Sequence, residues 1–136
     1  MDTLDYVECQ RVLYRFVRAL DEGKFDEVAA TMADDGVWHR QGEVLKGRAA
    51  VVAALNKRGP AVLTRHMVTN IVIESTGPDS ALSRCTTLVY RSEASTAPPV
   101  KMDLPRSVAD YEDRFVRRNG RWEIFERRSS RIFAKE

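Results

Sequence analysis

The fold is decided at residues 64–73, TRHMVTNIVI, where the spacing of apolar residues changes from the period of a helix to that of a strand. Alternate residues of this stretch form two sets, one of His66, Val68, Asn70 and Val72 and the other of Met67, Thr69, Ile71 and Ile73. Successive side chains of a strand point to opposite faces of a sheet, so each set is expected to lie on its own face. Both sets are partly apolar. Because one face of such a sheet is normally exposed to solvent in a monomer, an apolar outer face indicates a subunit interface.

Strand-like segments continue to the end of the chain and predict an antiparallel meander. They cover residues 62–74, 80–92, 106–118 and 121–133. Gly77-Pro78-Asp79 joins the first two, and Asn119-Gly120, the strongest hairpin signal in the chain, joins the last two. The connection at residues 93–105 is long and rich in small residues and proline, which leaves open whether it is a lid over a cavity or a tolerated insertion.

The segments before residue 62 have mostly the helical period. Helices are expected at residues 3–22, 25–32 and 48–57, and a small hairpin at residues 37–40 and 43–45. Gly23 ends the first helix, Gly47 starts the third, and Asp34-Asp35-Gly36 is expected to be the turn that stops the second. Helices that precede an antiparallel sheet indicate an α+β domain in which the sheet curls around the helices.

Length and composition indicate one compact domain over residues 1–136, because the chain is 43% hydrophobic and long enough for a single core. It has 22 basic and 20 acidic residues, so no overall field points to a nucleic acid or an anionic membrane as a partner. Seven arginines occur near the C-terminus: Arg114, Arg117, Arg118, Arg121, Arg127, Arg128 and Arg131. Interleaved acids favour a solvated strand face or a network of interface ion pairs over a nucleic-acid patch.

Cysteine and histidine usage predicts a protein without a metal site. Cys9 and Cys85 lack metal-type spacing and lie among apolar neighbours, so they are expected to be buried free thiols. Two histidines and two scattered cysteines do not make a metal cluster, and the sequence contains no phosphate loop and no dinucleotide fingerprint. We therefore expect no cofactor. The acidic N-terminal residues 1–5 and the lack of a long apolar segment lead us to expect a cytoplasmic protein.

Asp21 and His66 are the strongest candidates for a catalytic site. Asp21 ends the first expected helix, and His66 lies on the first long strand. A carboxylate that holds an imidazole in one tautomer is the basic unit of a proton-transfer site. The alternative is an exposed aspartate in an Asp-Glu-Gly turn and a core histidine bonded to the backbone. The residue pattern alone leaves both interpretations open.

Several short motifs, in their order and spacing, resemble the SnoaL-like group of the nuclear transport factor 2-like superfamily. They are residues 20–26 (LDEGKFD), 34–37 (DDGV), 47–48 (GR), 65–70 (RHMVTN) and 120–124 (GRWEI). The likeness covers nearly the whole chain. It implies a cone-shaped fold: a strongly curved, mixed or antiparallel sheet wrapped around three N-terminal helices, with an internal pocket.

The resemblance also implies a pairing of the two candidate residues. In scytalone dehydratase, hexachlorocyclohexane dehydrochlorinase and bile acid dehydratases, an Asp at the end of the first helix pairs with a His on the strand after the third helix. Asp21 and His66 match these two positions. The carry-over stops at this pair, because Leu20 and Arg40 stand where scytalone dehydratase places tyrosines, and residues 80–92 contain no second histidine. The substrate of scytalone dehydratase is therefore not expected.

If the pair forms, His66 is the general base and Asp21 fixes its tautomer. The rest of the pocket is expected to supply an aromatic wall and hydrogen-bond donors to a developing oxyanion. The expected substrate-binding residues are Tyr14, Val17, Trp38, Arg40, Asn70, Tyr90 and Tyr111.

The residues and the resemblance together lead us to expect a cofactor-independent lyase or isomerase, with dehydratase-like chemistry on a small, hydrophobic, cyclic molecule. Two alternatives stay open: a catalytically silent ligand-binding or assembly domain, and a small subunit that supports an oxygenase. The expected macromolecular partner is a further copy of the chain, in a homo-oligomer (a dimer or trimer) formed through the outer sheet face. Neither a nucleic acid nor a membrane is expected.

Overall fold

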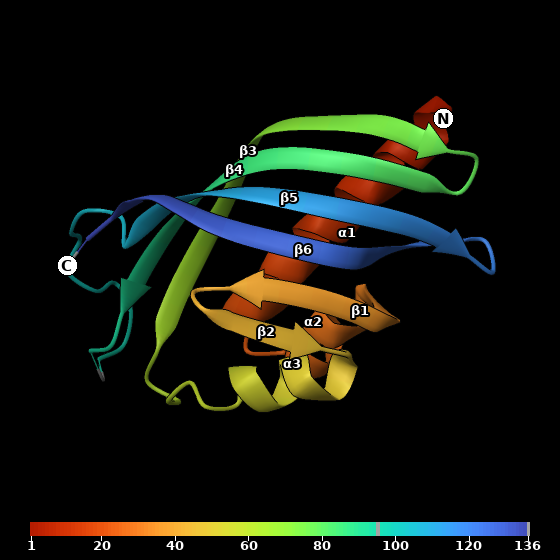
Figure 1. Ribbon diagram of the computed structural model, residues 1–136. Coiled ribbons are helices and arrows are strands. Elements are labelled where there is room, and N and C mark those ends of the chain that lie inside the picture. The colour runs from red at the N-terminus through yellow and green to blue at the C-terminus, as the bar shows by residue number, and fades with distance from the viewer. Residues whose placement is uncertain (95, 136) are drawn as a thin grey trace.

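The computed structural model describes residues 1–94 and 96–135, and their elements follow the expected order, helices first and then a meander (Figure 1). The helices are α1 (Thr3–Asp21), α2 (Phe25–Ala30) and α3 (Arg48–Leu55). The strands are β1 (Met32–Arg40), β2 (Glu43–Lys46), β3 (Leu63–Gly77), β4 (Ser80–Ser92), β5 (Ser107–Arg118) and β6 (Arg121–Ala134). The predicted α+β class is confirmed. No helix within the described residues is long and apolar enough to span a bilayer.

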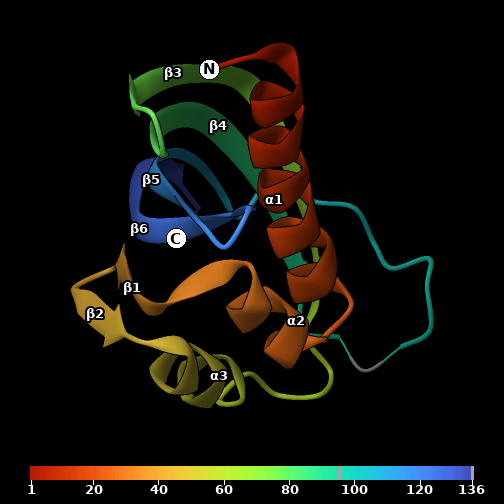
Figure 2. The same cartoon turned by 90° about the vertical axis from the view of Figure 1, so that its right-hand side faces the viewer.

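The strands form one mixed sheet in the order β2-β1-β6-β5-β4-β3. Strands β3 to β6 are an antiparallel meander, as predicted, whereas β1 pairs with β6 in parallel. Within the described part of the chain the sheet does not close, and β2 and β3 form its edges. Figures 1 and 2 show the sheet curving around α1, with α2 and α3 at the end near β1 and β2.

Helix α1 crosses the concave side of the sheet and places Asp21 beside β3. A capping box starts the helix, because the Asp2 carboxylate accepts the Asp5 N–H at 2.8 Å while the Asp5 carboxylate accepts the Asp2 N–H. The buried face of the helix consists of Cys9, Val12, Leu13, Phe16, Val17, Ala19 and Leu20. This face packs on β3 and β6, which are at different places in the sheet. The helix therefore spans the cone, and its C-terminal end reaches the first half of β3.

Strand β3 bends at Asn70, and the bend overturns part of the predicted alternation (Figure 1). Asn70 has a φ of 55°, a left-handed conformation that asparagine tolerates better than most residues. The pairing with β4 shifts between Thr69 and Val72, as in a β-bulge. Beyond the bulge Ile73 is buried and Val72 is exposed, although the alternation placed Val72 on the same face as His66. A one-residue bulge exchanges the two faces of a strand, so the prediction was wrong after Thr69.

Residues 34–36 belong to β1 and are not the predicted turn. Helix α2 ends and β1 begins earlier than expected, and the register of β1 on β6 shifts between Met32 and Val37. A Cβ at Gly36 would lie only 3.0 Å from the carbonyl oxygen of Ile124 on β6. The glycine therefore allows the two backbones to approach closely at an irregularity within the strand. The residues Asp-Asp-Gly are compatible both with a turn and with such a bulge, so the local sequence did not distinguish the two.

Arg127 is buried, although the arginines near the C-terminus were predicted to be solvated or to lie in an interface. Its Nε and Nη2 donate to the two carboxylate oxygens of Asp113 at 2.7 and 2.9 Å. Its guanidinium lies 4.0 Å from the ring centroid of Phe16 and 4.6 Å from that of Tyr111. The register of β5 on β6 sets Asp113 opposite Arg127. The charge is thus compensated by a neighbouring strand, and no local pattern reveals that partner.

Cys9 and Cys85 are buried free thiols, as predicted. Burial raises the pKa of Cys9 to about 12 and that of Cys85 to about 11. Both thiols are therefore protonated at neutral pH and serve as small apolar core residues.

Candidate active site

Asp21 and His66 meet where the end of α1 reaches β3. The Oδ1 atom of Asp21 lies 2.6 Å from Nδ1 of His66, and Oδ2 accepts the backbone N–H of His66 at 2.8 Å. Each side chain is only 8% exposed. Because an ionised carboxylate can only accept, Nδ1 carries the proton and the lone pair of the neutral ring lies on Nε2. Nε2 has no hydrogen-bond partner among the described residues, so its lone pair is available to accept a proton.

A short chain of hydrogen bonds also links Asp21 to Thr64 and, through Thr64, to Arg58. Thr64 Oγ1 donates to Asp21 Oδ1 at 2.8 Å, and Arg58 Nη2 donates to Thr64 Oγ1 at 3.1 Å. Burial is the largest single influence on the pKa of Asp21 and raises it. The hydrogen bonds and charge of His66, with the hydroxyl of Thr64, together outweigh burial and hold that pKa below its ordinary value. Asp21 is therefore ionised at neutral pH and can stabilise an imidazolium on His66.

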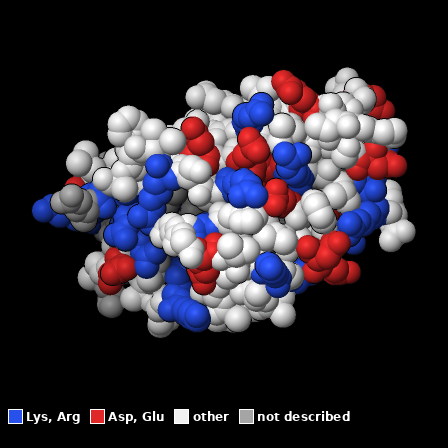
Figure 3. Space-filling model, viewed as in Figure 1, with Lys and Arg blue, Asp and Glu red and all other residues white. Residues whose placement is uncertain are grey.

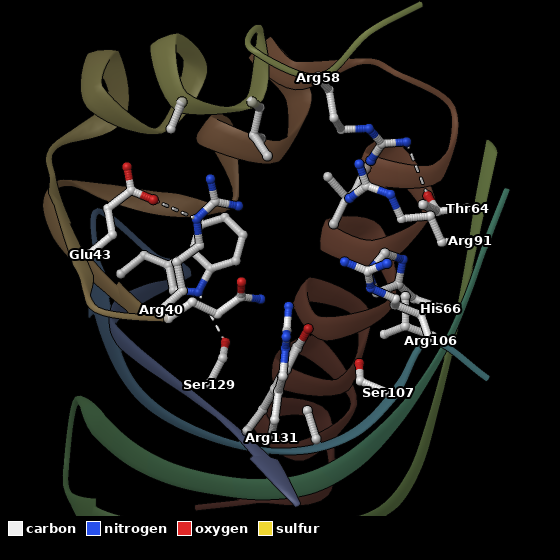
Figure 4. A pocket seen from close by; sticks show the side chains of 18 of the residues that line it. Arg40, Glu43, Arg58, Thr64, His66, Arg91, Arg106, Ser107, Ser129 and Arg131 are labelled. Carbon is white, nitrogen blue, oxygen red and sulfur yellow. Dashed lines mark hydrogen bonds and ion pairs between the residues drawn. The ribbon is translucent and has the colours of Figure 1, made fainter. Parts of the chain in front are cut away.

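His66 lines a pocket of about 410 Å³ inside the curved sheet (Figure 4). The apolar part of the lining includes Leu20, Trp38, Leu55, Val89, Ala109 and Tyr111. The basic part consists of Arg40, Lys57, Arg58, Arg91, Arg106 and Arg131. The volume suits a small organic molecule. Of the basic residues only Arg40 was predicted to line the pocket, and the structure adds the other five.

Trp38 forms the aromatic wall that was expected, and it is also part of the core. The side chain is 4% exposed and packs edge to face on Phe16, with ring centroids 5.2 Å apart. Its Nε1–H donates to Ser129 Oγ at 3.0 Å, which fixes the ring. The guanidinium of Arg40 lies over the Trp38 ring, 4.8 Å from its centroid. Trp38 therefore belongs both to the pocket lining and to the hydrophobic core.

Tyr111 also lines the pocket. Only 7% of the residue is exposed, and burial holds the pKa of its phenol above the ordinary value. Tyr111 therefore stays protonated and can donate a hydrogen bond to a bound oxygen atom.

Four of the predicted substrate-binding residues lie outside this pocket. Tyr14 and Val17 lie along a separate groove between α1 and β3, next to the Asp21–His66 pair but outside the cone. Asn70 is exposed at the bulge of β3. Tyr90 directly precedes the pocket residue Arg91 on β4 and therefore points to the opposite face of the sheet. Tyr14 and Val17 were chosen because they share a helix face with Asp21, and Asn70 and Tyr90 because they lie on long strands. Neither feature determines whether a residue faces the inside of the curved sheet.

The long connection between β4 and β5 does not cover the pocket. None of its described residues, 93–94 and 96–105, lines the cavity, and Ser95 lies outside the described residues. The structure thus supplies no support for the interpretation of this connection as a lid.

The other histidine lies away from the pocket. His39 is half-buried, and its Nε2 lies 3.2 Å from Glu126 Oε2. Within residues 1–94 and 96–135, no group of three or more His, Cys, Asp or Glu is arranged to hold a metal ion.

Residues 1–128 match the family model of the SnoaL-like domain. The chain belongs to the SnoaL-like family. The predicted resemblance is confirmed, and the open, curved, mixed sheet over N-terminal helices agrees with it. A search of curated proteins finds no match to this SnoaL-like chain.

Solved structures with the same fold include proteins of several kinds. A protein from Catenulispora acidiphila in complex with S-DNPA is 30% identical, with a TM-score of 0.79 over 96% of this chain and 95% of that one. A scytalone dehydratase-like protein from Novosphingobium aromaticivorans is 20% identical, with a TM-score of 0.82 over 97% and 87% of the two chains. A type 2 hexachlorocyclohexane dehydrochlorinase is 17% identical, with a TM-score of 0.80 over 97% and 88%. At such identities the last two show a shared fold alone.

The basic lining of the SnoaL-like pocket was missed by sequence reasoning. Arg58 follows α3, Arg91 is near the end of β4, Arg106 precedes β5 and Arg131 is on β6. These residues are far apart in the chain, and most of them lie at the ends of elements. A local pattern carries no information on which ends converge, so only the sheet order and register bring the four arginines together.

Proposed function

We propose that this SnoaL-like protein is a cofactor-independent lyase or isomerase of the dehydratase type, with His66 as the general base. The observation that carries the proposal is the 2.6 Å contact between Asp21 Oδ1 and His66 Nδ1 at the wall of the pocket. This contact leaves Nε2 as the basic atom of the ring. The scytalone dehydratase-like protein and the dehydrochlorinase, which share the fold, support an elimination by their names.

In the proposed elimination, His66 Nε2 removes a proton from a carbon atom next to a carbonyl group. The electron pair of the broken C–H bond forms a C=C bond while the neighbouring C–O bond breaks. The departing hydroxyl takes the proton from the imidazolium and leaves as water, which restores the neutral ring. In an isomerisation, the imidazolium instead returns the proton to a different carbon. Asp21 stabilises the imidazolium in either case, and general base catalysis contributes about 10²–10⁴-fold to the rate.

The pocket supports a small ligand with a flat ring. Trp38 offers a fixed aromatic wall, and the buried Tyr111 offers a hydrogen-bond donor. The Catenulispora acidiphila protein, at 30% identity, was solved in complex with S-DNPA, which supports a ligand-binding use of the fold.

The test follows exchange of α-protons in D₂O by ¹H NMR, and enone formation by absorbance, over a panel of cyclic β-hydroxy ketones. His66→Gln keeps a side chain of similar size and a donor to Asp21, and we expect it to lower the rate by about 10²–10⁴-fold with an unchanged melting temperature. His39→Gln is the matched control, because it removes the histidine outside the pocket and should leave the rate unchanged.

Equal rates for the wild type and His66→Gln would contradict the proposal. A wild-type protein that binds members of the panel without exchanging their protons would instead be a ligand-binding domain, the alternative from the other functional class.

A further inference from the structure

Basic side chains are concentrated around the pocket to a degree that the composition of the chain does not explain. The whole chain has 22 basic and 20 acidic residues, so charges are nearly balanced. The pocket is lined by Arg40, Lys57, Arg58, Arg91, Arg106 and Arg131, against a single acid, Glu43. Figure 3 shows the same bias on the surface, where Lys and Arg gather on the left of the view, toward the end labelled C in Figure 1.

Glu43 compensates only the charge of Arg40, with which it pairs at 3.3 Å, and leaves the charge of the other basic residues of the pocket. Among the described residues Arg91 pairs only with Glu93, which is just after the end of the same strand and has 67% side-chain exposure. Arg106 and Arg131 form no ion pair with any carboxylate among the described residues. Arg106 and Arg131 therefore carry positive charge that no carboxylate of the described residues compensates, and the pocket as a whole has an excess of basic side chains.

The arginines on the outer face of the sheet behave differently. They pair with acids across or along the strands: Arg84 with Glu112 at 3.4 Å, Arg114 with Glu126 at 3.6 Å and Arg128 with Glu126 at 3.5 Å. Paired charge is thus usual on this sheet, and unpaired charge occurs at the pocket.

The side chains of Arg40, Arg91, Arg106 and Arg131 point into one open space from opposite sides of the pocket (Figure 4). Like charges that converge repel one another, and the repulsion is stronger where water is partly excluded. The effect is visible at Arg58, whose pKa is lowered first by burial and then by the charge of Arg91. An arrangement of this kind costs free energy in the empty protein, and a bound anion would offset that cost.

We propose that the ligand of this pocket carries an anionic oxygen group, a carboxylate or a phosphate, that Arg91, Arg106 and Arg131 bind. The guanidinium fork of arginine matches both groups in geometry, since it donates two parallel hydrogen bonds. The apolar body of the ligand packs against Trp38. The location of the reacting carbon next to His66 rests on the proposed function, whereas the anion site does not. The same positive field would stabilise the negative charge that develops when His66 removes a proton.

The test measures binding by isothermal titration calorimetry with 2-naphthoate, 2-naphthyl phosphate and the neutral 2-naphthamide. We expect the wild type to bind at least one anion about tenfold or more tightly than the amide, the effect of one hydrogen bond to a charged group. This preference should shrink as the sodium chloride concentration rises. Whichever anion binds more tightly identifies the group as a carboxylate or a phosphate.

Arg106→Gln combined with Arg131→Gln should bring the preference to about threefold or less, a loss of the charged contacts, and leave the affinity for the amide unchanged. Both residues lack an ion pair among the described residues, so their removal leaves no described carboxylate unpaired. The matched control is Arg114→Gln combined with Arg128→Gln, which removes the same charge from the outer face of β5 and β6. The control should keep the wild-type preference.

Three results would overturn the proposal: equal binding of the anions and the amide, no binding of either anion, or an equal loss of preference in the control. His66→Gln separates this inference from the proposed function, since it should bind the anion like the wild type. Anion preference without proton exchange would leave the anion site standing and remove only the proposed function. Proton exchange on neutral ketones without anion preference would remove the anion site and leave the proposed function standing.

Discussion

Replacement of Asp21 by asparagine should invert the tautomer of His66, because the carboxylate at this position accepts three hydrogen bonds. They come from His66 Nδ1 at 2.6 Å, from the His66 backbone N–H at 2.8 Å and from Thr64 Oγ1 at 2.8 Å. Asparagine has one acceptor oxygen, and the backbone N–H of His66 needs it because that group cannot change its role. The amide NH₂ must then face Nδ1, which can accept only if the ring proton moves to Nε2. The variant is therefore expected to lose the basic lone pair on Nε2.

The size of both effects follows from the same geometry. A hydrogen bond to a charged group contributes about 1.5–3 kcal/mol and a neutral one about 0.5–1.5 kcal/mol, so we expect Asp21→Asn to lower the free energy of unfolding by about 1–3 kcal/mol. The loss in rate should be about 10²–10⁴-fold or slightly more, since inversion of the tautomer in a serine-protease triad costs about 10⁴-fold. We therefore expect Asp21→Asn to fold with modestly lower stability and to lose nearly all of its rate of proton abstraction.

Three measurements on the same samples check the reasoning. ¹⁵N-detected ring correlations of His66 report which nitrogen carries the proton, urea unfolding reports stability, and α-proton exchange reports the rate. Glu22→Gln is the matched control, because it removes the same charge at the same end of α1, where the Glu22 carboxylate pairs with the exposed Lys24 at 3.1 Å. A protonated Nδ1 in Asp21→Asn, or an equal loss of rate in Glu22→Gln, would refute the tautomer argument.

Three further predictions concern buried or shifted groups. Asp113→Ala leaves the guanidinium of Arg127 buried without its partner and should lower the free energy of unfolding in urea by about 3–5 kcal/mol, while Asp113→Ala with Arg127→Met should recover most of the loss. Equal stability of the single and double variants would show that the charge is not the cause. The pKa of Asp21 is lower in the folded protein than its ordinary value of 3.8, so its stabilising contribution is complete above that value and is lost as the pH falls through the lower folded pKa. Stability measured by urea unfolding should therefore fall more steeply below about pH 4 in the wild type than in Asp21→Asn, and parallel curves would contradict this. Because burial raises the pKa of Cys9 to about 12 and that of Cys85 to about 11, neither thiol should react with a disulfide reagent at neutral pH until urea unfolds the chain, and fast labelling of the folded protein would show that a thiol is accessible.

Some features of the fold were predictable because they depend on neighbours in the sequence. The apolar stripe of α1 has the helical period, and Asn119-Gly120 specifies the hairpin between β5 and β6 by its turn chemistry. Gly47 was correctly placed before α3. Each of these signals acts within a few residues, so the chain order of helices and strands could be read directly.

Other predictions failed where the same local pattern serves two structures. The Asp34-Asp35-Gly36 stretch has the composition of a turn but lies within β1, where Gly36 permits close approach to β6. The alternation in β3 was right at His66 and wrong beyond Asn70, because a single residue in the left-handed conformation exchanges the faces. Bulges of this kind depend on the partner strand, and the partner strand is not visible in the local sequence.

The sequence by itself determined the α+β class, the order of the elements and, through a family resemblance, the identity of Asp21 and His66 as a candidate pair. Only the tertiary structure decided that the two side chains meet, that Arg127 is buried against Asp113, and that the cavity is lined with arginines. The physical reason is one of range. Periodicity and turn chemistry are set by residues a few positions apart, whereas the register of strands and the convergence of their ends are set by packing between segments distant in the chain.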